Sequence, residues 1–201
     1  MTRIAVFLDY QNAYHGAREV FGDPSTDPPT MGHVNPLRLG LLLTQLGAEG
    51  DPNRELTAVT VYRGRPGAKS HRNLQSAFDR QVTAWQQMPL VTVRSRPLRY
   101  QPIAWSQGAP SEWRGQEKGI DVLMAIDIAL GARDDRYDVA VIVSADTDLV
   151  PAIEVALDAA ASSGEKMGAP LALIGGAFMV IMGYPPLAGI MDSASLTGPG
   201  L

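Results

Sequence analysis

Short apolar runs alternate with longer segments of helical periodicity along most of this chain. Four runs of strand length lie at 3–8, 56–64, 90–98 and 138–144, and a fifth, PLALIGG, lies at 170–176. Segments with an amphipathic or leucine-rich helical pattern lie between them, at about 10–21, 36–47, 71–87, 118–133 and 149–163. Strands and helices that alternate in this way predict a parallel sheet with both faces covered by helices.

The segments between these elements predict loops. A Pro-rich stretch, GDPSTDPPTMGH, follows the first helix, and QPIAWSQGAPSEW, at 101–113, follows the third strand. The chain has 201 residues, of which 45% are hydrophobic, and this is enough to bury a core without disulfide bonds. We therefore expect one domain over 1–201, with an atypical apolar segment from about residue 167.

Aspartates follow two of the predicted strands at the point where each strand ends. Asp9 ends the first strand, and Asp146 and Asp148 come just after the fourth. Because the carboxyl ends of parallel strands meet at one edge of a sheet, where ligands bind, these residues should share that edge. Asp121 opens the helix before the fourth strand and can face the same edge. Asp127 lies about 9 Å further along the helix axis and is expected either to support the site from behind the ligands or to be structural.

Each of these aspartates also has a simpler interpretation. Asp9 and either Asp146 or Asp148 suit helix N-caps, and Asp121 suits the first turn of a helix. If the carboxylates do converge, two of them at about 4 Å repel by roughly 4 kcal/mol at an effective dielectric of about 20. Such a cluster requires either protonation or a cation, and aspartate oxygens without histidine or cysteine partners favour Mg²⁺ or Mn²⁺. A divalent ion there would suit phosphodiester hydrolysis.

Basic residues concentrate in one segment of an otherwise acidic chain. Residues 63–118 hold ten basic and three acidic residues, a balance of +7, while the rest of the chain carries −11. The same segment holds the three tryptophans of the chain, Trp85, Trp105 and Trp113. Basic and aromatic side chains together suit a phosphate backbone and unstacked bases, although solvated charges on helix faces are the alternative. The candidates for phosphate contact are Arg94, Arg96 and Arg99.

An uncharged run of 25 residues, 167–191, follows the last predicted helix. Glycine and proline pairs interrupt it, which favours a buried strand followed by an apolar docking or homodimer surface over a membrane span. The chain has no cysteine, and its first apolar run, Ile4–Leu8, is too short for a signal peptide. These features predict a cytoplasmic protein.

Three stretches of the sequence resemble the motifs of a known domain family. VFLDYQNAY resembles the (V/I)-x-(I/V)-D-x-x-N opening of NYN domains, EKGIDV resembles their (E/K)-K-G-(V/I)-D-V helix, and SADTDLVP resembles their (S/T)-(G/A)-D-(S/T)-D-(F/L)-x-P turn. The resemblance covers position 3 to about 160 and points to the LabA-like bacterial branch of the PIN-like nucleases.

This resemblance implies a three-layer α/β/α fold with a mainly parallel sheet and a Mg²⁺- or Mn²⁺-dependent ribonuclease. Asn12 matches the family's motif asparagine, which would orient a metal-bound water or a carboxylate, and Lys118 matches a lysine that would contact phosphate. Tyr10 departs from the pattern, because many relatives carry a small residue there, and its ring would narrow the approach to the first motif aspartate. The metal-binding acids of the family match Asp9, Asp121, Asp146 and Asp148.

Two functions of different classes are consistent with these features. The first is a metal-dependent ribonuclease, and the second is a catalytically weak RNA- or protein-binding regulatory module that retains the acidic site. The acidic set favours the first, because a binding module gains nothing from repelling charges, although the set also suits a metal site that only holds the fold. A haloacid-dehalogenase-type phosphatase is disfavoured because FLDYQ lacks a second aspartate two residues after the first.

Overall fold

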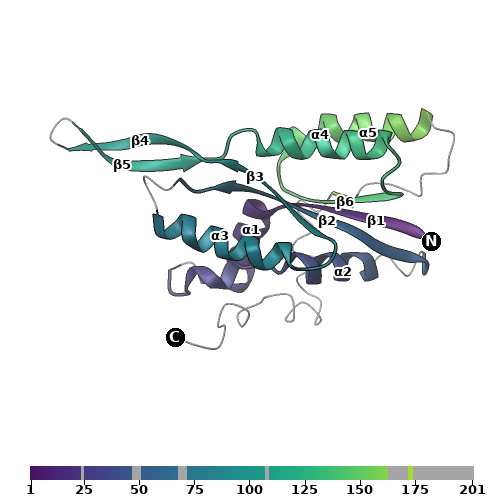
Figure 1. The fold of residues 1–201 in the computed structure, drawn as a ribbon, viewed down its shortest axis with the longest axis horizontal. Helices are drawn as coiled ribbons and strands as arrows, with labels where there is room; N and C mark the ends of the chain where they lie inside the picture. The colour runs from purple at the N-terminus through teal and green to yellow at the C-terminus, as the bar shows by residue number, and fades with distance from the viewer. Residues whose placement is uncertain (24, 47–50, 68–71, 107–108, 163–171, 174–201) are drawn as a thin grey trace.

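A parallel sheet forms the centre of the protein (Figure 1). The computed structural model describes residues 1–23, 25–46, 51–67, 72–106, 109–162 and 172–173, and within these ranges five strands pair in the order β3-β2-β1-β6-β7. All four pairings are parallel, which confirms the sequence prediction. The strands are β1 (Thr2–Asp9), β2 (Arg54–Arg65), β3 (Val91–Pro97), β6 (Val139–Val143) and β7 (Ala172–Leu173).

Helices cover both faces of this sheet (Figure 1). One face carries α1 (Tyr10–Phe21), α2 (Pro36–Leu46) and α3 (Arg72–Gln86), and the other carries α4 (Ile120–Arg133) and α5 (Val150–Ser162). Alternate residues of β1 contribute to the two cores, with Ile4, Val6 and Leu8 on one face and Ala5 and Phe7 on the other. The protein is therefore the expected three-layer α/β/α sandwich.

The strand order reverses beside β1. The chain passes from β1 to β2 on one side and later adds β6 on the other side, where Leu8 pairs with Val143. The next residues along these two strands, Asp9 and Ser144, are hydrogen-bonded neighbours. Ligands of open parallel sheets bind at the carboxyl ends of the strands where the order reverses. A ligand site is therefore expected beside Asp9 and Ser144.

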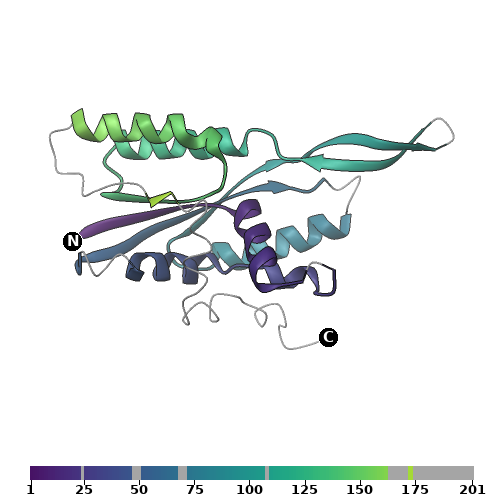
Figure 2. The same ribbon diagram turned by 180° about the vertical axis from the view of Figure 1, so that it is seen from behind.

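An antiparallel hairpin projects beyond the carboxyl edge of the main sheet (Figures 1 and 2). It consists of β4 (Arg99–Ser106) and β5 (Ala109–Gln116), and we call it the arm. The prediction of a loop at 101–113 is therefore wrong. Pro102 and Pro110 are typical of loops, but a two-stranded hairpin contains only edge strands, where the missing N–H of proline can face solvent.

Trp85 and Tyr10 belong to the core. Trp85 is 4% exposed, and its ring centroid lies 4.6 Å from that of Tyr10. The Tyr10 hydroxyl accepts hydrogen bonds from the backbone N–H of Val34 at 3.3 Å and from Gln81 Nε2 at 3.2 Å. Two expectations are therefore wrong: Trp85 does not face nucleic acid, and Tyr10 does not narrow the approach to Asp9, because both rings are buried.

The predicted fifth strand is present as β7, which pairs with β6 at Ala172–Leu173. The rest of the uncharged run 167–191 lies outside the described residues, and so does the docking or dimer surface expected there. Among the helices that the structure describes, none is long and apolar enough to cross a membrane.

Candidate functional site

Hydrogen bonds around the Ser144 hydroxyl hold the ends of β1 and β6 together. Ser144 Oγ donates to Asp9 Oδ2 at 3.0 Å and accepts from the backbone N–H of Asp146 at 3.1 Å. Asn12 joins from α1: its side-chain nitrogen donates to Ser144 Oγ at 3.1 Å and to Asp9 Oδ2, and its backbone N–H donates to Asp9 Oδ1 at 3.1 Å. Ser144 is 3% exposed, so one buried hydroxyl fixes Asp9 relative to Asp146.

The capping interpretations of the aspartates also hold. Asp9 is the N-cap of α1, and Asp146 caps the short 3₁₀ helix η2 (Thr147–Leu149) by accepting from the backbone N–H of Asp148 at 2.9 Å. Asp121 lies in the first turn of α4, where the helix dipole favours an acid. A carboxylate has about four acceptor sites, so a cap leaves capacity for a further ligand. Capping and metal binding are therefore compatible at these residues.

Three of the four predicted aspartates, Asp9, Asp121 and Asp146, line one pocket of about 230 Å³ at the carboxyl edge of the sheet. We call it the acidic pocket. None of the described residues that line it is a lysine or an arginine, and Glu117 adds a fourth carboxylate. The remaining lining residues are Gln11, Asn12, His15, Ile120 and Met124.

Glu117, which the sequence motifs left without a role, has an unusual environment in this pocket. Its Oε1 accepts from the backbone N–H of Gly64 at 2.7 Å, and the Gln11 amide nitrogen, when turned toward it, donates to its two oxygens at 3.1 and 3.2 Å. Burial raises the pKa of Glu117 and the charges of Asp9 and Asp121 add to this, while the Gly64 hydrogen bond opposes it. Burial is the largest cause, and the nearby charge of Arg63 opposes it only in part, so this environment disfavours the ionised form of Glu117. The only sign in the sequence that Glu117 belongs to the site was its position in the EKGID stretch.

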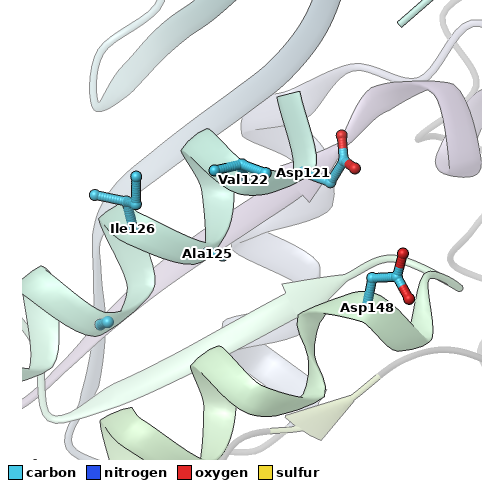
Figure 3. Close-up of a pocket in the computed structure, with 6 residues that line it drawn as sticks. Asp121, Val122, Ala125, Ile126 and Asp148 are labelled. Atoms are coloured by element: carbon cyan, nitrogen blue, oxygen red, sulfur yellow. The ribbon is translucent and has the colours of Figure 1, made fainter. Parts of the chain in front are cut away.

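Asp148 lies beside the acidic pocket rather than in it. Its side chain is exposed and, with Asp121, lines a second pocket of about 320 Å³ (Figure 3). Figure 3 shows the two carboxylates at the same end of this pocket, one from α4 and the other from η2. The other lining residues are the apolar Val122, Ala125, Ile126 and Ala129. Asp121 therefore borders both pockets, whereas Asp148 lines the second one.

Exposed cations lie where α4 begins. Gly119 precedes this helix with φ +76°, a conformation that glycine adopts readily, and the Arg96 guanidinium lies against it, with Nη1 3.6 Å from the point where a Cβ would stand. Lys118 is exposed next to Gly119, and Arg99 is exposed at the start of the arm. Three of the four predicted phosphate-contacting residues, Arg96, Arg99 and Lys118, therefore lie on the chain that links the sheet edge, the arm and α4.

Arg94 is engaged elsewhere. Its guanidinium donates to the Asp127 carboxylate at 2.8 and 3.1 Å, and the Tyr62 hydroxyl donates to the same carboxylate at 2.8 Å. Arg94 and Asp127 line a separate pocket of about 270 Å³. Asp127 thus forms an ion pair with Arg94 outside the acidic pocket, and this pair partly neutralises the charge that Arg94 could offer to a phosphate.

A half-buried arginine contributes positive charge near the acidic pocket. The Arg63 guanidinium carbon lies 4.8, 5.1 and 5.8 Å from the ring centroids of Tyr10, Phe78 and Trp85, and its Nη1 donates to Gln81 Oε1. Burial lowers the pKa of Arg63, and nearby negative charge, including that of Glu117, opposes this change. The aromatic rings therefore hold the Arg63 guanidinium in place. In the sequence, Arg63 was only one member of the basic segment.

The acidic pocket contains the oxygen donors that a hard divalent cation prefers. Among the described residues, however, no three acidic or histidine side chains stand close enough together to hold one ion. Like charges repel at short range, so the carboxylates would have to rotate toward one another around a cation. The donor chemistry fits such an ion, and binding would require this local rearrangement.

The sequence profile of the NYN domain matches residues 3–161, which is most of the chain. The chain belongs to the NYN domain family. This family is part of the PIN-like nuclease superfamily. Among curated proteins, none matches this NYN chain. A crystal structure of a Vibrio parahaemolyticus protein of unknown function is similar over 86% of this chain and 93% of that chain, with 15% sequence identity and a TM-score of 0.44.

Proposed function

We propose that this NYN domain protein is a ribonuclease that hydrolyses RNA phosphodiester bonds at the acidic pocket and requires Mg²⁺ or Mn²⁺. The observation that carries the proposal is the convergence of Asp9, Glu117, Asp121 and Asp146 on one pocket, whose lining, as far as the structure describes it, holds no lysine or arginine. The raised pKa of Glu117 is consistent with it, because a bound cation would stabilise the ionised carboxylate that burial disfavours. NYN domains also commonly bind RNA.

The divalent ion would activate a water molecule and stabilise the charge that develops on the phosphate. Asp9, Asp121 and Asp146 are the candidate ligands, with Asp148 as a further ligand from the adjacent pocket. Asn12 and Ser144 keep Asp9 oriented through their hydrogen bonds.

Glu117 and the exposed cations would act on the substrate and on the attacking water. A carboxylate with a raised pKa suits proton acceptance from an attacking water, and this is the role we assign to Glu117. Lys118, Arg96 and Arg99 would hold substrate phosphates beside it, because they are exposed around the start of α4 and of the arm.

One observation favours the alternative of a catalytically weak RNA- or protein-binding module: among the described residues, no three acidic or histidine side chains stand close enough together to hold one ion. Cleavage of single-stranded and structured RNA, measured with and without Mn²⁺, separates the two functions. Asp146→Asn should abolish metal-dependent cleavage, and because asparagine caps as well as aspartate, it removes the charge without removing the cap. Asp127→Asn is the matched control, since Asp127 lies on α4 outside the acidic pocket. Cleavage by Asp146→Asn at the wild-type rate would refute the metal-site assignment.

Metal binding can also be measured without cleavage. Mn²⁺ at a hundredfold excess over its Kd should stabilise the native state by about 2.7 kcal/mol, visible as a rise in melting temperature. The double variant Asp146→Asn/Asp148→Asn should lose this rise, and its metal-free form should be no less stable than the wild type apart from a changed cap, worth at most about 1 kcal/mol. If Mn²⁺ leaves the wild-type melting temperature unchanged and calorimetry detects no binding, the module is the better assignment.

A further inference from the structure

The arm exposes two of the three tryptophans of the protein. Trp105 and Trp113 are 65% and 42% exposed, and Ile103 is 50% exposed, whereas Trp85 is buried. Exposed aromatic side chains on a projecting element lose the free energy of burial and are typical of a contact surface. The fold itself does not require large apolar side chains at these positions, because they lie outside both core clusters.

The base of the arm is packed firmly against the main sheet. Leu98 fills the space beside Gly64 and Gly115; a Cβ at Gly64 would collide with it, and one at Gly115 would make a tight contact. The Tyr100 hydroxyl accepts a hydrogen bond from the backbone N–H of Gly67 at 3.0 Å. These contacts set the direction of the arm relative to the carboxyl edge of the sheet, so a ligand held on the arm is held in a defined position.

The arm leads directly into the acidic pocket. β5 ends at Gln116, the next residue is Glu117 of that pocket, and Asp121 follows in the first turn of α4. The arm and its base, residues 94–118, carry five basic residues against two acidic ones. Arg99 and Arg114 are exposed on the arm, so positive charge is present between the tryptophans and the acidic pocket. This charge complements a phosphate backbone that enters the pocket.

We propose that the arm binds a single-stranded segment of RNA, whose bases stack on Trp105 and Trp113 while its phosphates follow the basic residues toward the acidic pocket. This inference rests on the proposed function and narrows its substrate class. Bases in a duplex are stacked on one another and are inaccessible to an indole, whereas unpaired bases can stack on one. The arm therefore selects single-stranded over double-stranded RNA.

The test is binding of a single-stranded RNA of about 20 nucleotides to the full chain in EDTA, where cleavage does not interfere. Trp105→Ala/Trp113→Ala should weaken binding by at least about 5-fold per tryptophan, because each lost stacked base removes that much affinity. Trp105→Phe/Trp113→Phe should retain most of the affinity, since phenylalanine keeps a stacking face. Leu41→Ala/Leu46→Ala is the matched control on α2, because these leucines are 52% and 38% exposed, and it should not change binding.

Tryptophan fluorescence gives a second readout. RNA should quench the emission of the wild-type protein, because two of its three tryptophans would stack on bases. Trp105→Phe/Trp113→Phe leaves only the buried Trp85, whose emission should not respond to RNA. A response from Trp85 alone as large as that of the wild type would contradict stacking on the arm.

Other outcomes overturn the proposal in distinct ways. If the double alanine variant binds single-stranded RNA as tightly as the wild type, the proposal is wrong. If the variant loses as much affinity for duplex RNA as for single-stranded RNA, the arm does not prefer single strands. A change of oligomeric state with unchanged RNA affinity would show that the arm docks protein instead. If RNA binding depends on the two tryptophans but no metal-dependent cleavage is found, the arm proposal is supported and the ribonuclease proposal is refuted. If the protein cleaves RNA but its affinity does not depend on the tryptophans, the ribonuclease is supported and the arm proposal is refuted.

Discussion

Replacing Ser144 by alanine tests whether one hydroxyl holds the acidic pocket together. The substitution removes three hydrogen bonds at once: one donated to the Asp9 carboxylate and two accepted from Asn12 and from the backbone of Asp146. Because Ser144 is almost fully buried, the groups left behind cannot all turn to solvent. The ends of β1 and β6 would lose the side-chain link between them.

The expected cost follows from these contacts. A hydrogen bond to a charged group contributes about 1.5–3 kcal/mol and a neutral one about 0.5–1.5 kcal/mol, so simple addition gives roughly 2.5–6 kcal/mol. The upper end is an overestimate, because Asp9 keeps its hydrogen bonds from Asn12 and the Asp146 N–H is only partly buried. We therefore expect Ser144→Ala to lower the free energy of unfolding by about 2.5–4 kcal/mol.

Urea unfolding in EDTA measures this change in the absence of metal. Ser25→Ala is the matched control, because Ser25 Oγ also donates to a carboxylate, that of Asp23, but at an exposed site, and its loss should matter little. We also expect weaker Mn²⁺ binding by Ser144→Ala, since Asp9 and Asp146 are no longer fixed relative to each other. A free energy of unfolding within about 0.5 kcal/mol of the wild type would refute the reasoning, since that is the range of ordinary surface substitutions.

Two further predictions concern charge. Glu117→Gln keeps a hydrogen-bond acceptor for the Gly64 N–H but removes a carboxylate whose pKa is raised in the folded protein. As the pH rises above 4.5, the ordinary pKa of glutamate, ionisation of this carboxylate lowers the stability of the wild type. The variant should therefore be the more stable protein at neutral pH in EDTA, and urea unfolding across pH should show the difference vanish below 4.5; a difference independent of pH would contradict this. Neutralising Arg94, Arg96 and Arg99 together should flatten the log–log salt dependence of RNA binding by up to about three units, with Arg94 contributing least because of its ion pair. An unchanged slope would identify these arginines as ordinary solvated charges.

The sequence predicted the elements whose side chains are buried in a regular pattern. All five residues of β6 are buried, and its continuous apolar run identified it as a strand covered on both faces. The positions of Asp9 and Asp146 at one edge followed from the parallel direction of their strands. The arm was missed because an exposed two-stranded hairpin buries neither face, so its sequence lacks the alternation that marks a half-buried strand.

Contacts between distant segments were the part that the sequence could not supply. Trp85 and Trp105 lie in the same basic segment, and only tertiary packing shows that the first is buried and the second exposed. The link between Ser144 and Asp9 depends on the register between β1 and β6, which no local pattern specifies. Glu117 likewise joins the pocket through the backbone of Gly64, a residue far away in sequence.

The link between Asp9 and Ser144 joins positions 135 residues apart, and this separation bears on when activity can begin during synthesis. β1 leaves the ribosome first, but its end gains its neighbour only after β6 and η2 have emerged. Pairings between residues so distant in sequence form late, because the intervening chain must be closed into a loop before they yield any free energy. Until these two elements have emerged, a nascent chain would therefore carry no complete acidic pocket. For a ribonuclease of the kind proposed, this order of assembly would delay activity until the last part of translation.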